Sequence, residues 1–450
     1  MVAAPTRYHA IVIGGGPAGA TAALVMARAG LRVLLVDRVT HPRFHIGESF
    51  LPRNRTLIEE LGLADRLAAI PQTVKLGAEF AFGDLQATRE FRFDSGLSCG
   101  ETVAWNVERA PFDAMILNAA KDAGVEVREN VTVTRVPLLR DGEVTVETDA
   151  GTFHASYLMD ASGQQTVLGR QLKTRRVLEN HQKVAYFGHF KGVHRHPGER
   201  AGIPFFAVCS EGWFWAIPID PVRTSIGLVC DAAAAKKIDT PPNQMLRWAI
   251  ARCPAMHERT RTAVYPEQNG VCADFSYRCE PYAGPGYFLL GDAAMFVDPI
   301  FSTGVCLGMM GAKLAAESVV KLVGGSNQAD RYRREYISYL NASSAEFFTL
   351  IDLYYQHSFR ELFMHGRGPL QIPQAVISLL GGHAFPRPPF KLRWRMRVFE
   401  QLIKLNRHVA LVPRLKPFSL LDSPPALAVE QARREPLIVT RAEHAVGAVA

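Results

Sequence analysis

The sequence predicts an α/β protein with a mostly helical C-terminal part, and three observations lead to this fold class. The chain opens with an apolar run, a glycine-rich turn, an alanine-rich segment and a second apolar run, which is the order of a βαβ unit with parallel strands. Two later apolar runs, over residues 157–159 and 287–290, are also followed by turns that contain glycine. Beyond residue 330, aromatic residues recur at helical spacing over residues 342–363.

The composition is that of a folded globular protein. The chain has 450 residues, 48% of them hydrophobic, which is enough for two or three domains with substantial cores. It contains no apolar run of about 18 residues or more and no signal-peptide pattern at its start, so we expect a cytoplasmic protein without a membrane span. The seven cysteines never form a C-x-x-C pair, which predicts reduced thiols and no metal site.

The first βαβ unit, residues 8–38, carries a dinucleotide-binding pattern. Gly14 suits a tight turn, Gly16 lets backbone N–H groups approach a pyrophosphate, and Gly19 lets the following helix pack closely on the strand. The pyrophosphate would lie at the helix N-terminus, where unpaired N–H groups favour an anion. Asp37 stands where an acid binds a ribose hydroxyl. The residues predicted to bind the dinucleotide here are Gly14, Gly16, Ala18, Gly19, Asp37 and Arg38.

Distant segments favour FAD over NAD as this dinucleotide. Arg109 stands at the start of an amphipathic segment, Asp160 ends a strand at a glycine turn, and Gly291 and Asp292 end another strand. A strand that ends in Gly-Asp can place its carboxylate on the ribityl chain of a flavin, with the next helix N-terminus directed at the ring. NAD sites do not need this second anchor. These four residues are therefore predicted to bind FAD.

In this order, the glycine-rich turn, the DASG turn and the GDAA segment resemble the FAD-dependent monooxygenase and halogenase superfamily. The resemblance covers residues 8 to about 330. It implies a Rossmann-like, GR2-type FAD-binding domain interleaved with an antiparallel β-sheet substrate domain. The expected divisions are 1–72, 106–175 and 272–330 for the FAD-binding domain, 73–105 and 176–271 for the substrate domain, 331–420 for the helical region and 421–450 for a loosely ordered tail.

Two segments near the start resemble flavin-dependent halogenases in particular. The segment RFHIGESFLP contains Gly47, Glu48 and Ser49, which the resemblance places beside the flavin ring, although these residues could instead cap the following helix. The segment TVKLGAEF contains Lys75, at the place where halogenases carry their active lysine. On residue type alone, Lys75 would be a surface residue.

Two further signatures of the same halogenases lie later in the chain. The segment EGWFWAIPI matches W-x-W-x-I-P and places both indoles on one face of a strand, where they would wall a narrow, dry passage or simply fill a core. Residues 296–304 match F-x-x-P-x-x-S-x-G. Backbone N–H groups near Gly304 and Val305 can face both the flavin and a small anion, in a site that we expect to lack carboxylates. The resulting predictions are Trp213, Trp215, Ile217, Pro218 and Phe296 for the passage, Pro299, Gly304 and Val305 for flavin contact, and Ser302, Thr303 and Gly304 for the halide.

The resemblance implies a two-component halogenase that uses O2, chloride or bromide, and FADH2 from a separate flavin reductase. The halide would attack a flavin hydroperoxide and give hypohalous acid, which Lys75 would hydrogen-bond or carry as a haloamine to an electron-rich aromatic carbon. Burial would help by lowering the pKa of the lysine. Tryptophan halogenases have a glutamate where this chain has Phe301, so a phenol or pyrrole is the expected substrate.

The C-terminal region suggests a partner. Residues 387–416 hold nine Lys and Arg residues against one Glu, which forms either a docking face for an acidic partner or an ordinary solvated helix. The LYYQ segment resembles halogenases whose substrate is held on an acyl or peptidyl carrier protein. No nucleic-acid reading motif is present, and a nucleic-acid partner is not expected. Two alternatives stay open: an aromatic hydroxylase or related FAD oxidoreductase on the same fold, and a flavin-binding protein without halogenating activity. Asp274 is a candidate for covalent flavin attachment, with a turn role favoured.

Overall fold

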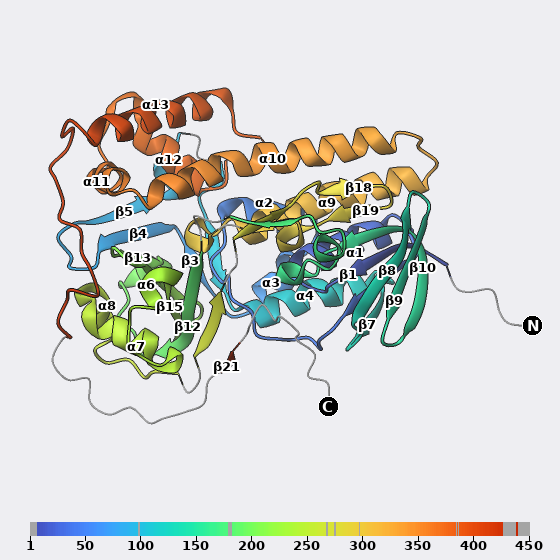
Figure 1. Cartoon of the computed structure of the whole chain (residues 1–450), viewed down its shortest axis with the longest axis horizontal. Helices are drawn as coiled ribbons and strands as arrows, with labels where there is room; N and C mark the ends of the chain where they lie inside the picture. The colour runs from blue at the N-terminus through green and yellow to red at the C-terminus, as the bar shows by residue number, and fades with distance from the viewer. Residues whose placement is uncertain are drawn as a thin grey trace, which may run out of the picture.

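The computed structural model describes residues 7–425 and 438–439, with short gaps at 98–99, 179–181, 267–268, 274–275, 297, 384 and 386. Asp274 and most of the expected tail therefore lie outside the described residues. Two large sheets lie side by side, and the long helices of the C-terminal region run above them (Figure 1).

The first sheet has the order β18-β19-β10-β1-β2-β7, with a β8–β9 hairpin added to β10. Its strands β19, β10, β1, β2 and β7 are parallel, as the first βαβ unit predicts, and β8, β9 and β18 pair in antiparallel fashion. The strands are β1 (Arg7–Ile13), β2 (Val33–Asp37), β7 (Glu126–Glu129), β8 (Val133–Arg140), β9 (Glu143–Thr148), β10 (Gly151–Asp160), β18 (Ala283–Gly284) and β19 (Tyr287–Leu289). The predicted α/β class is confirmed.

The second sheet has the order β21-β16-β12-β15-β14-β13-β4-β5. It is not wholly antiparallel as expected, because β4 pairs with β13 in parallel; the two strands are far apart in sequence, so no hairpin fixes their directions. The expected domain boundary at residue 272 falls inside β16, which pairs with β12 of this sheet. The strands are β4 (Gly77–Phe82), β5 (Thr88–Arg92), β12 (Lys183–Lys191), β13 (Phe205–Val208), β14 (Gly212–Pro218), β15 (Arg223–Asp231), β16 (Gly270–Ala273) and β21 (Ile438–Val439).

The remaining strands form two smaller sheets. β3 pairs with β6 in a two-stranded sheet, and β17 pairs with both β11 and β20 in a three-stranded one. These strands are β3 (Gln72–Lys75), β6 (Ala104–Val107), β11 (Arg175–Val177), β17 (Tyr277–Cys279) and β20 (Met295–Phe296).

Helices cover both faces of the second sheet, and the side chains of β14 show why. Trp213, Trp215 and Ile217 pack with the C-terminal helices, whereas Phe214 and Ala216 pack with α7 and α8 on the opposite face. This alternation is the two-residue period of a strand buried on both sides. The helices are α1 (Pro17–Arg28), α2 (Pro52–Glu60), α3 (Ala64–Ala68), α4 (Arg109–Asp122), α5 (Val167–Gln171), α6 (Ala232–Ala235), α7 (Pro242–Arg252), α8 (Pro254–Thr260), α9 (Gly304–Val323), α10 (Ala329–Tyr354), α11 (His357–His365), α12 (Ile372–Leu380) and α13 (Phe390–Asn406).

Within the described part of the chain, no helix is both long and apolar enough to cross a membrane. The same residues contain no cluster of three or more His, Cys, Asp and Glu side chains suited to a metal ion. The free thiols of Cys209, Cys230, Cys253, Cys279 and Cys306 are buried.

Candidate active site

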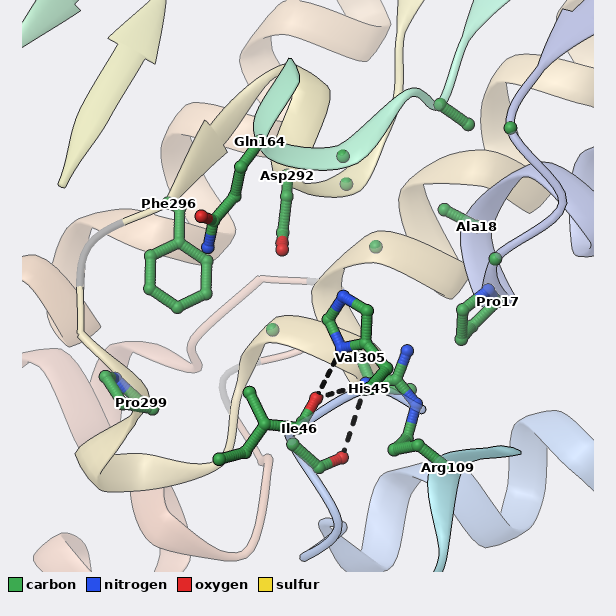
Figure 2. A pocket seen from close by; sticks show the side chains of 18 of the residues that line it. Pro17, Ala18, His45, Ile46, Arg109, Gln164, Asp292, Phe296, Pro299 and Val305 are labelled. Carbon is green, nitrogen blue, oxygen red and sulfur yellow. Dashed lines mark hydrogen bonds between the residues drawn. The ribbon is translucent and has the colours of Figure 1, made fainter. Parts of the chain in front are cut away.

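A cavity of about 630 Å³ lies where the first sheet meets the second (Figure 2). Its walls come from the carboxyl ends of β1 and β2, the N-termini of α1 and α9, and the face of the second sheet toward α10. Of the predicted cofactor-binding residues, all except Gly19 and Asp160 line it. Those that do are Gly14, Gly16, Ala18, Asp37, Arg38, Gly47, Glu48, Ser49, Arg109, Gly291, Asp292, Pro299, Gly304 and Val305.

The three glycines of the first turn have different surroundings. Gly14 has a φ of +99°, and a Cβ atom there would lie 2.3 Å from the carbonyl oxygen of Ala161. A Cβ atom on Gly19 would lie 1.9 Å from the carbonyl oxygen of Gly14, so this glycine lets α1 pack against the turn. A Cβ atom on Gly16 would contact Arg43 at 3.4 Å and otherwise point into free space. Gly14 and Gly19 are therefore required by the fold, and Gly16 leaves room for a ligand.

The two acids that end parallel strands have different positions. The Asp37 carboxylate lines the cavity and accepts hydrogen bonds from the backbone N–H groups of Gly15, at 2.6 Å, and Val39, at 3.0 Å. Asp160 is completely buried and accepts from the N–H groups of Ser162, at 3.0 Å, and Leu168, at 2.7 Å. Asp160 therefore shapes the turn that lines the cavity and does not line the cavity itself.

Arg109 fixes the loop that contains the GES segment. Its guanidinium forms a two-point ion pair with Asp113, at 2.7 and 3.0 Å, and donates to the Ile46 carbonyl at 2.8 Å (Figure 2). His45 donates from Nδ1 to the same carbonyl at 2.6 Å. Burial and the nearby cations Arg109 and Arg43 lower the pKa of His45 to about 3, so its ring is neutral.

Glu48 and Ser49 are buried at the cavity wall. The Glu48 carboxylate lies 2.7 Å from Nε2 of His189. Burial opposes a charge on His189, but the hydrogen bond and negative charge of Glu48 outweigh it and raise the pKa of His189. Ser49 Oγ has no hydrogen-bond partner within the described residues, which leaves it available to a ligand.

Asp292 follows β19 and points into the cavity beside Gln164 and Phe296 (Figure 2). Burial raises the pKa of its carboxyl to about 6, and the positive charge of Arg109 opposes this shift. Asp298 also lines the cavity, where its Oδ1 accepts from the Ile300 N–H at 2.9 Å. Two carboxyl groups therefore line the same cavity as residues 296–304, the loop that the sequence predicts to bind the halide and that is called the halide loop below, although a site without carboxylates was expected.

The halide loop forms a short 3-10 turn over Pro299–Phe301 and then reaches Ser302, which has a φ of +56°. This left-handed residue redirects the chain into α9, whose first residues Gly304 and Val305 line the cavity. Ser302 and Thr303 line it as well. An anion in this part of the cavity would meet the N-terminus of a 20-residue helix.

Lys75 lies at the end of β3 and is 3% exposed, so the surface alternative is wrong. Its Nζ donates to the Phe50 carbonyl at 2.9 Å and lies 5.4 Å from the centre of the Phe93 ring. Burial lowers the pKa of Lys75 to about 7. Lys75 lines a second cavity of about 20 Å³, and among the described residues Ser302 and Phe206 line both cavities. The two cavities are therefore adjacent, and Ser302 and Phe206 lie where they meet.

Both tryptophans of β14 line the large cavity, with ring centres 5.8 Å apart. Trp213 donates from Nε1 to the Tyr355 hydroxyl at 3.0 Å, and Trp215 donates to Ser225 at 3.1 Å. Ile217 and Phe296 line the cavity too, whereas Pro218 ends the strand outside it.

Sequence reasoning missed several residues of the site. Phe206 belongs to an apolar run without a signature, and Gln164 and Asp298 carry no spacing signal. Tyr355 was part of the LYYQ segment, but nothing in that segment indicates its hydrogen bonds.

The cavity fits FAD. Gly16 leaves space for a pyrophosphate beside the N-terminus of α1, and Asp37 lies where a ribose would bind. At the other end, the buried Ser49 hydroxyl and the Asp292 carboxylate offer polar groups to a ribityl chain or ring. All of these residues line one continuous cavity.

Comparisons with known proteins agree with this fit. Residues 7–336 match the family described as FAD binding domain. The chain is 32% identical to the flavin-dependent halogenase armH4 of Armillaria mellea, over 70% of this chain and 65% of that protein. It is 31% identical to the 1H-pyrrole-2-carbonyl (peptidyl-carrier protein) brominase of Pseudoalteromonas luteoviolacea (strain 2ta16), over 84% of this chain and 92% of that protein. The solved structure of the flavin-dependent brominase Bmp2 has a TM-score of 0.77 and 29% identity, covering 88% of this chain and 100% of that chain. The chain thus spans slightly less than two thirds of armH4, but 92% of the pyrrole brominase sequence and all of the Bmp2 chain in the solved structure.

Proposed function

The chain belongs to the FAD-binding family and, within it, to the flavin-dependent halogenases; on this premise we propose that it halogenates an electron-rich aromatic ring with reduced FAD, O2 and a halide. The observation that carries the proposal is the position of Lys75. This buried lysine lines the second cavity, called the chamber below, whose walls include five phenylalanine rings. Ser302 and Phe206 line both the chamber and the flavin-sized cavity, so they lie where the two meet.

The residues of the large cavity would hold FAD and the halide. The N-terminus of α1 would bind the pyrophosphate, Asp37 the ribose, and Asp292 the ribityl chain. Bound FAD, reduced by a separate flavin reductase, would supply with O2 the oxidising power that a halide needs. Ser302, Thr303 and the N–H groups at the start of α9 would hold the halide. The aromatic walls of Trp213 and Trp215 would exclude water from it.

Lys75 would carry or polarise the oxidised halogen. With a pKa of about 7, both the ammonium and the neutral amine are populated near neutral pH. The ammonium can donate a hydrogen bond to hypohalous acid. The neutral amine can react with hypohalous acid, so that an N–halogen bond forms, the O–halogen bond breaks and water leaves. The Phe50 carbonyl holds Nζ in place through its 2.9 Å hydrogen bond. Either form delivers the halogen inside the aromatic chamber.

The chamber favours a ring that is already reactive. Among the described residues that line it, Lys75 and Ser302 have polar side chains and the others are apolar, including Phe301. Because no carboxylate lines it, we infer a phenol or pyrrole that is activated by its own OH or NH group. Its volume of about 20 Å³ holds little more than one water molecule, so the substrate must displace wall residues such as Ile377 and Leu380 of α12.

We also propose that the substrate is presented by an acidic carrier protein. Helix α12, which lines the chamber, packs against α13 at the outer surface (Figure 1). On α13, Phe390 is 72% exposed and Trp394 is 40% exposed, among exposed basic side chains that include Arg393 and Arg397. This combination suits a partner with acidic and apolar groups. The name of the Pseudoalteromonas luteoviolacea brominase, to which this chain is 31% identical, specifies a substrate on a peptidyl-carrier protein.

Charge reversal on α13 tests the docking proposal. The double change Arg393→Glu and Arg397→Glu should lower kcat/KM for a carrier-bound ring about tenfold at low salt, because like charges now face each other. Chlorination of the free ring should change less than twofold. A matched control is Arg140→Glu with Arg331→Glu, two exposed arginines at the end of β8 and in the first turn of α10. Equal rates with carrier-bound substrate in both double variants would exclude α13 as the docking face.

The function itself is tested by product mass. Phenols and pyrroles, free and carrier-bound, are incubated with the protein, FAD, a flavin reductase, NADH, O2 and either chloride or bromide. We expect products that carry the isotope pattern of the added halide and disappear when the halide is omitted. A gain of one oxygen without dependence on halide would identify a hydroxylase instead. Oxidation of FADH2 to FAD with reduction of O2 to hydrogen peroxide, and no modified product from any substrate, would identify a flavin-binding protein without halogenating activity.

A further inference from the structure

Tyr355 joins three separate parts of the site. It follows α10 directly, and its hydroxyl donates to Oδ2 of Asp298 at 2.5 Å. The same hydroxyl accepts from Nε1 of Trp213 at 3.0 Å. One phenol group therefore connects the C-terminal helical region, the halide loop and the tryptophan strand β14. Asp298 and Trp213 both line the large cavity, whereas Tyr355 does not.

Asp298 links Tyr355 to the halide loop through its second carboxylate oxygen. Its other oxygen, Oδ1, accepts from the Ile300 N–H and caps the turn over Pro299–Phe301. That turn ends at Ser302, which has a left-handed backbone and lines both cavities. A rotation of the Asp298 carboxylate would release the turn and move Ser302 away from its place between the cavities. The hydrogen bond from Tyr355 opposes such a rotation.

The surroundings keep the Tyr355 hydroxyl protonated, so that it can donate a hydrogen bond. Burial raises the pKa of its hydroxyl well above the ordinary value, and the negative charge of Asp298 raises it further. Nζ of Lys183 lies 3.8 Å from the centre of the ring and pairs with Asp231. The Tyr355 side chain is thus held by contacts to both its ring and its hydroxyl. A hydrogen bond from a protonated phenol to a buried carboxylate is among the stronger kinds in proteins.

We propose that Tyr355 is a positioning residue for halide binding and halogen transfer. Through Asp298 it sets the halide loop and Ser302, and through Trp213 it holds the wall of the passage toward Lys75. The proposal rests on the proposed function, because it assigns Tyr355 a part in the halide site of that reaction.

The test compares two adjacent tyrosines. Tyr355→Phe removes the hydroxyl that makes both hydrogen bonds, whereas Tyr354→Phe removes a buried hydroxyl that has no hydrogen-bond partner within the described residues. The oxidised, FAD-loaded proteins are titrated with sodium chloride and sodium bromide, and the change in flavin absorbance is followed. Tyr355→Phe should raise the apparent halide Kd about tenfold, as expected for a lost hydrogen bond to a charged group. Tyr354→Phe should leave it within twofold.

A second readout follows turnover. Tyr355→Phe should lower the halogenated product formed per FADH2 consumed at least about threefold and raise peroxide release, with FADH2 oxidation unchanged within twofold. Asp298→Asn keeps an acceptor for the Ile300 N–H but removes the charge, and it should likewise raise the apparent halide Kd and lower the halogenated product formed per FADH2 consumed. If Tyr355→Phe does not fold, Asp298→Asn is used to test the proposal instead.

Three outcomes would overturn the proposal: wild-type halide binding in Tyr355→Phe, equal impairment of the two tyrosine variants, or no spectral response to halide in the wild type. If the protein titrates with halide but forms no halogenated product, the proposed function fails, and the Kd of the Tyr355 variant still decides the structural part of the inference.

Discussion

Replacing Lys75 with alanine is expected to lower the rate of halogenation at least about 10²-fold while FADH2 oxidation continues. Loss of a positioned proton donor or acceptor commonly costs this much. Lys75 lines the small chamber and does not line the flavin-sized cavity, so the change leaves the predicted FAD contacts intact. Oxidised halogen would then form and be lost as hypohalous acid. Product mass, FADH2 absorbance and released hypohalous acid are measured on the same samples.

Two further variants separate the role of the amine from that of charge and packing. Lys75→Arg keeps a cation that stays protonated at any working pH, so it should not restore activity if the neutral amine carries the halogen. Lys75→Met keeps the volume and should be inactive but folded. Normal halogenation in Lys75→Ala would remove the observation on which the proposed function depends.

The pH dependence distinguishes the two roles of Lys75. Its pKa falls from the ordinary 10.5 to about 7 in the folded protein. A route through the neutral amine should therefore speed up as the pH rises through about 7 and then level off, whereas a route through the ammonium should slow down. Stability follows the same titration, because a lowered lysine pKa means that the unfolded chain binds the proton more tightly. The stability of the wild type relative to Lys75→Met should rise between pH 7 and pH 10.5.

Much of the fold was predictable because it depends on local patterns. The turn with Gly14 and Gly19 needs residues without a Cβ atom, and its spacing alone indicates a βαβ unit. The alternation of Trp213 and Trp215 places both indoles on one face, and the structure has them 5.8 Å apart. The direction of β4 was not predictable, because its pairing with β13 depends on contacts between distant segments.

The site was predicted less completely for the same reason. The burial of Lys75 follows from the pairing of β3 with β6 and from aromatic rings contributed by distant elements, which no local pattern contains. The hydrogen bonds of Tyr355 reach across 57 residues to Asp298 and 142 residues to Trp213. Asp160 shows the reverse case: its position at the end of β10 suggested contact with the cofactor, whereas in the structure both of its carboxylate oxygens accept hydrogen bonds from the following turn.

Two alanine substitutions in the first turn are expected to separate folding from FAD binding. In Gly19→Ala, the new Cβ would lie 1.9 Å from the backbone oxygen of Gly14, and no side-chain motion can relieve that contact. We expect the protein without FAD to lose about 3 kcal/mol of unfolding free energy, at the upper end of the usual cost of overpacking, and to bind no FAD.

Gly16→Ala should behave differently, because its new Cβ would meet the flexible end of Arg43 at 3.4 Å and the backbone φ of −69° suits alanine. The free energy of unfolding of the FAD-free variant should therefore stay within about 0.5 kcal/mol of the wild-type value, as for substitutions that create no clash. The FAD Kd should rise at least about tenfold, because the methyl group occupies the space left for the pyrophosphate. Chemical denaturation without FAD and fluorescence titration with FAD measure the two effects. Unchanged FAD affinity in Gly16→Ala would mean that the pyrophosphate does not lie on this turn, and the orientation of the cofactor along the cavity would have to be reversed.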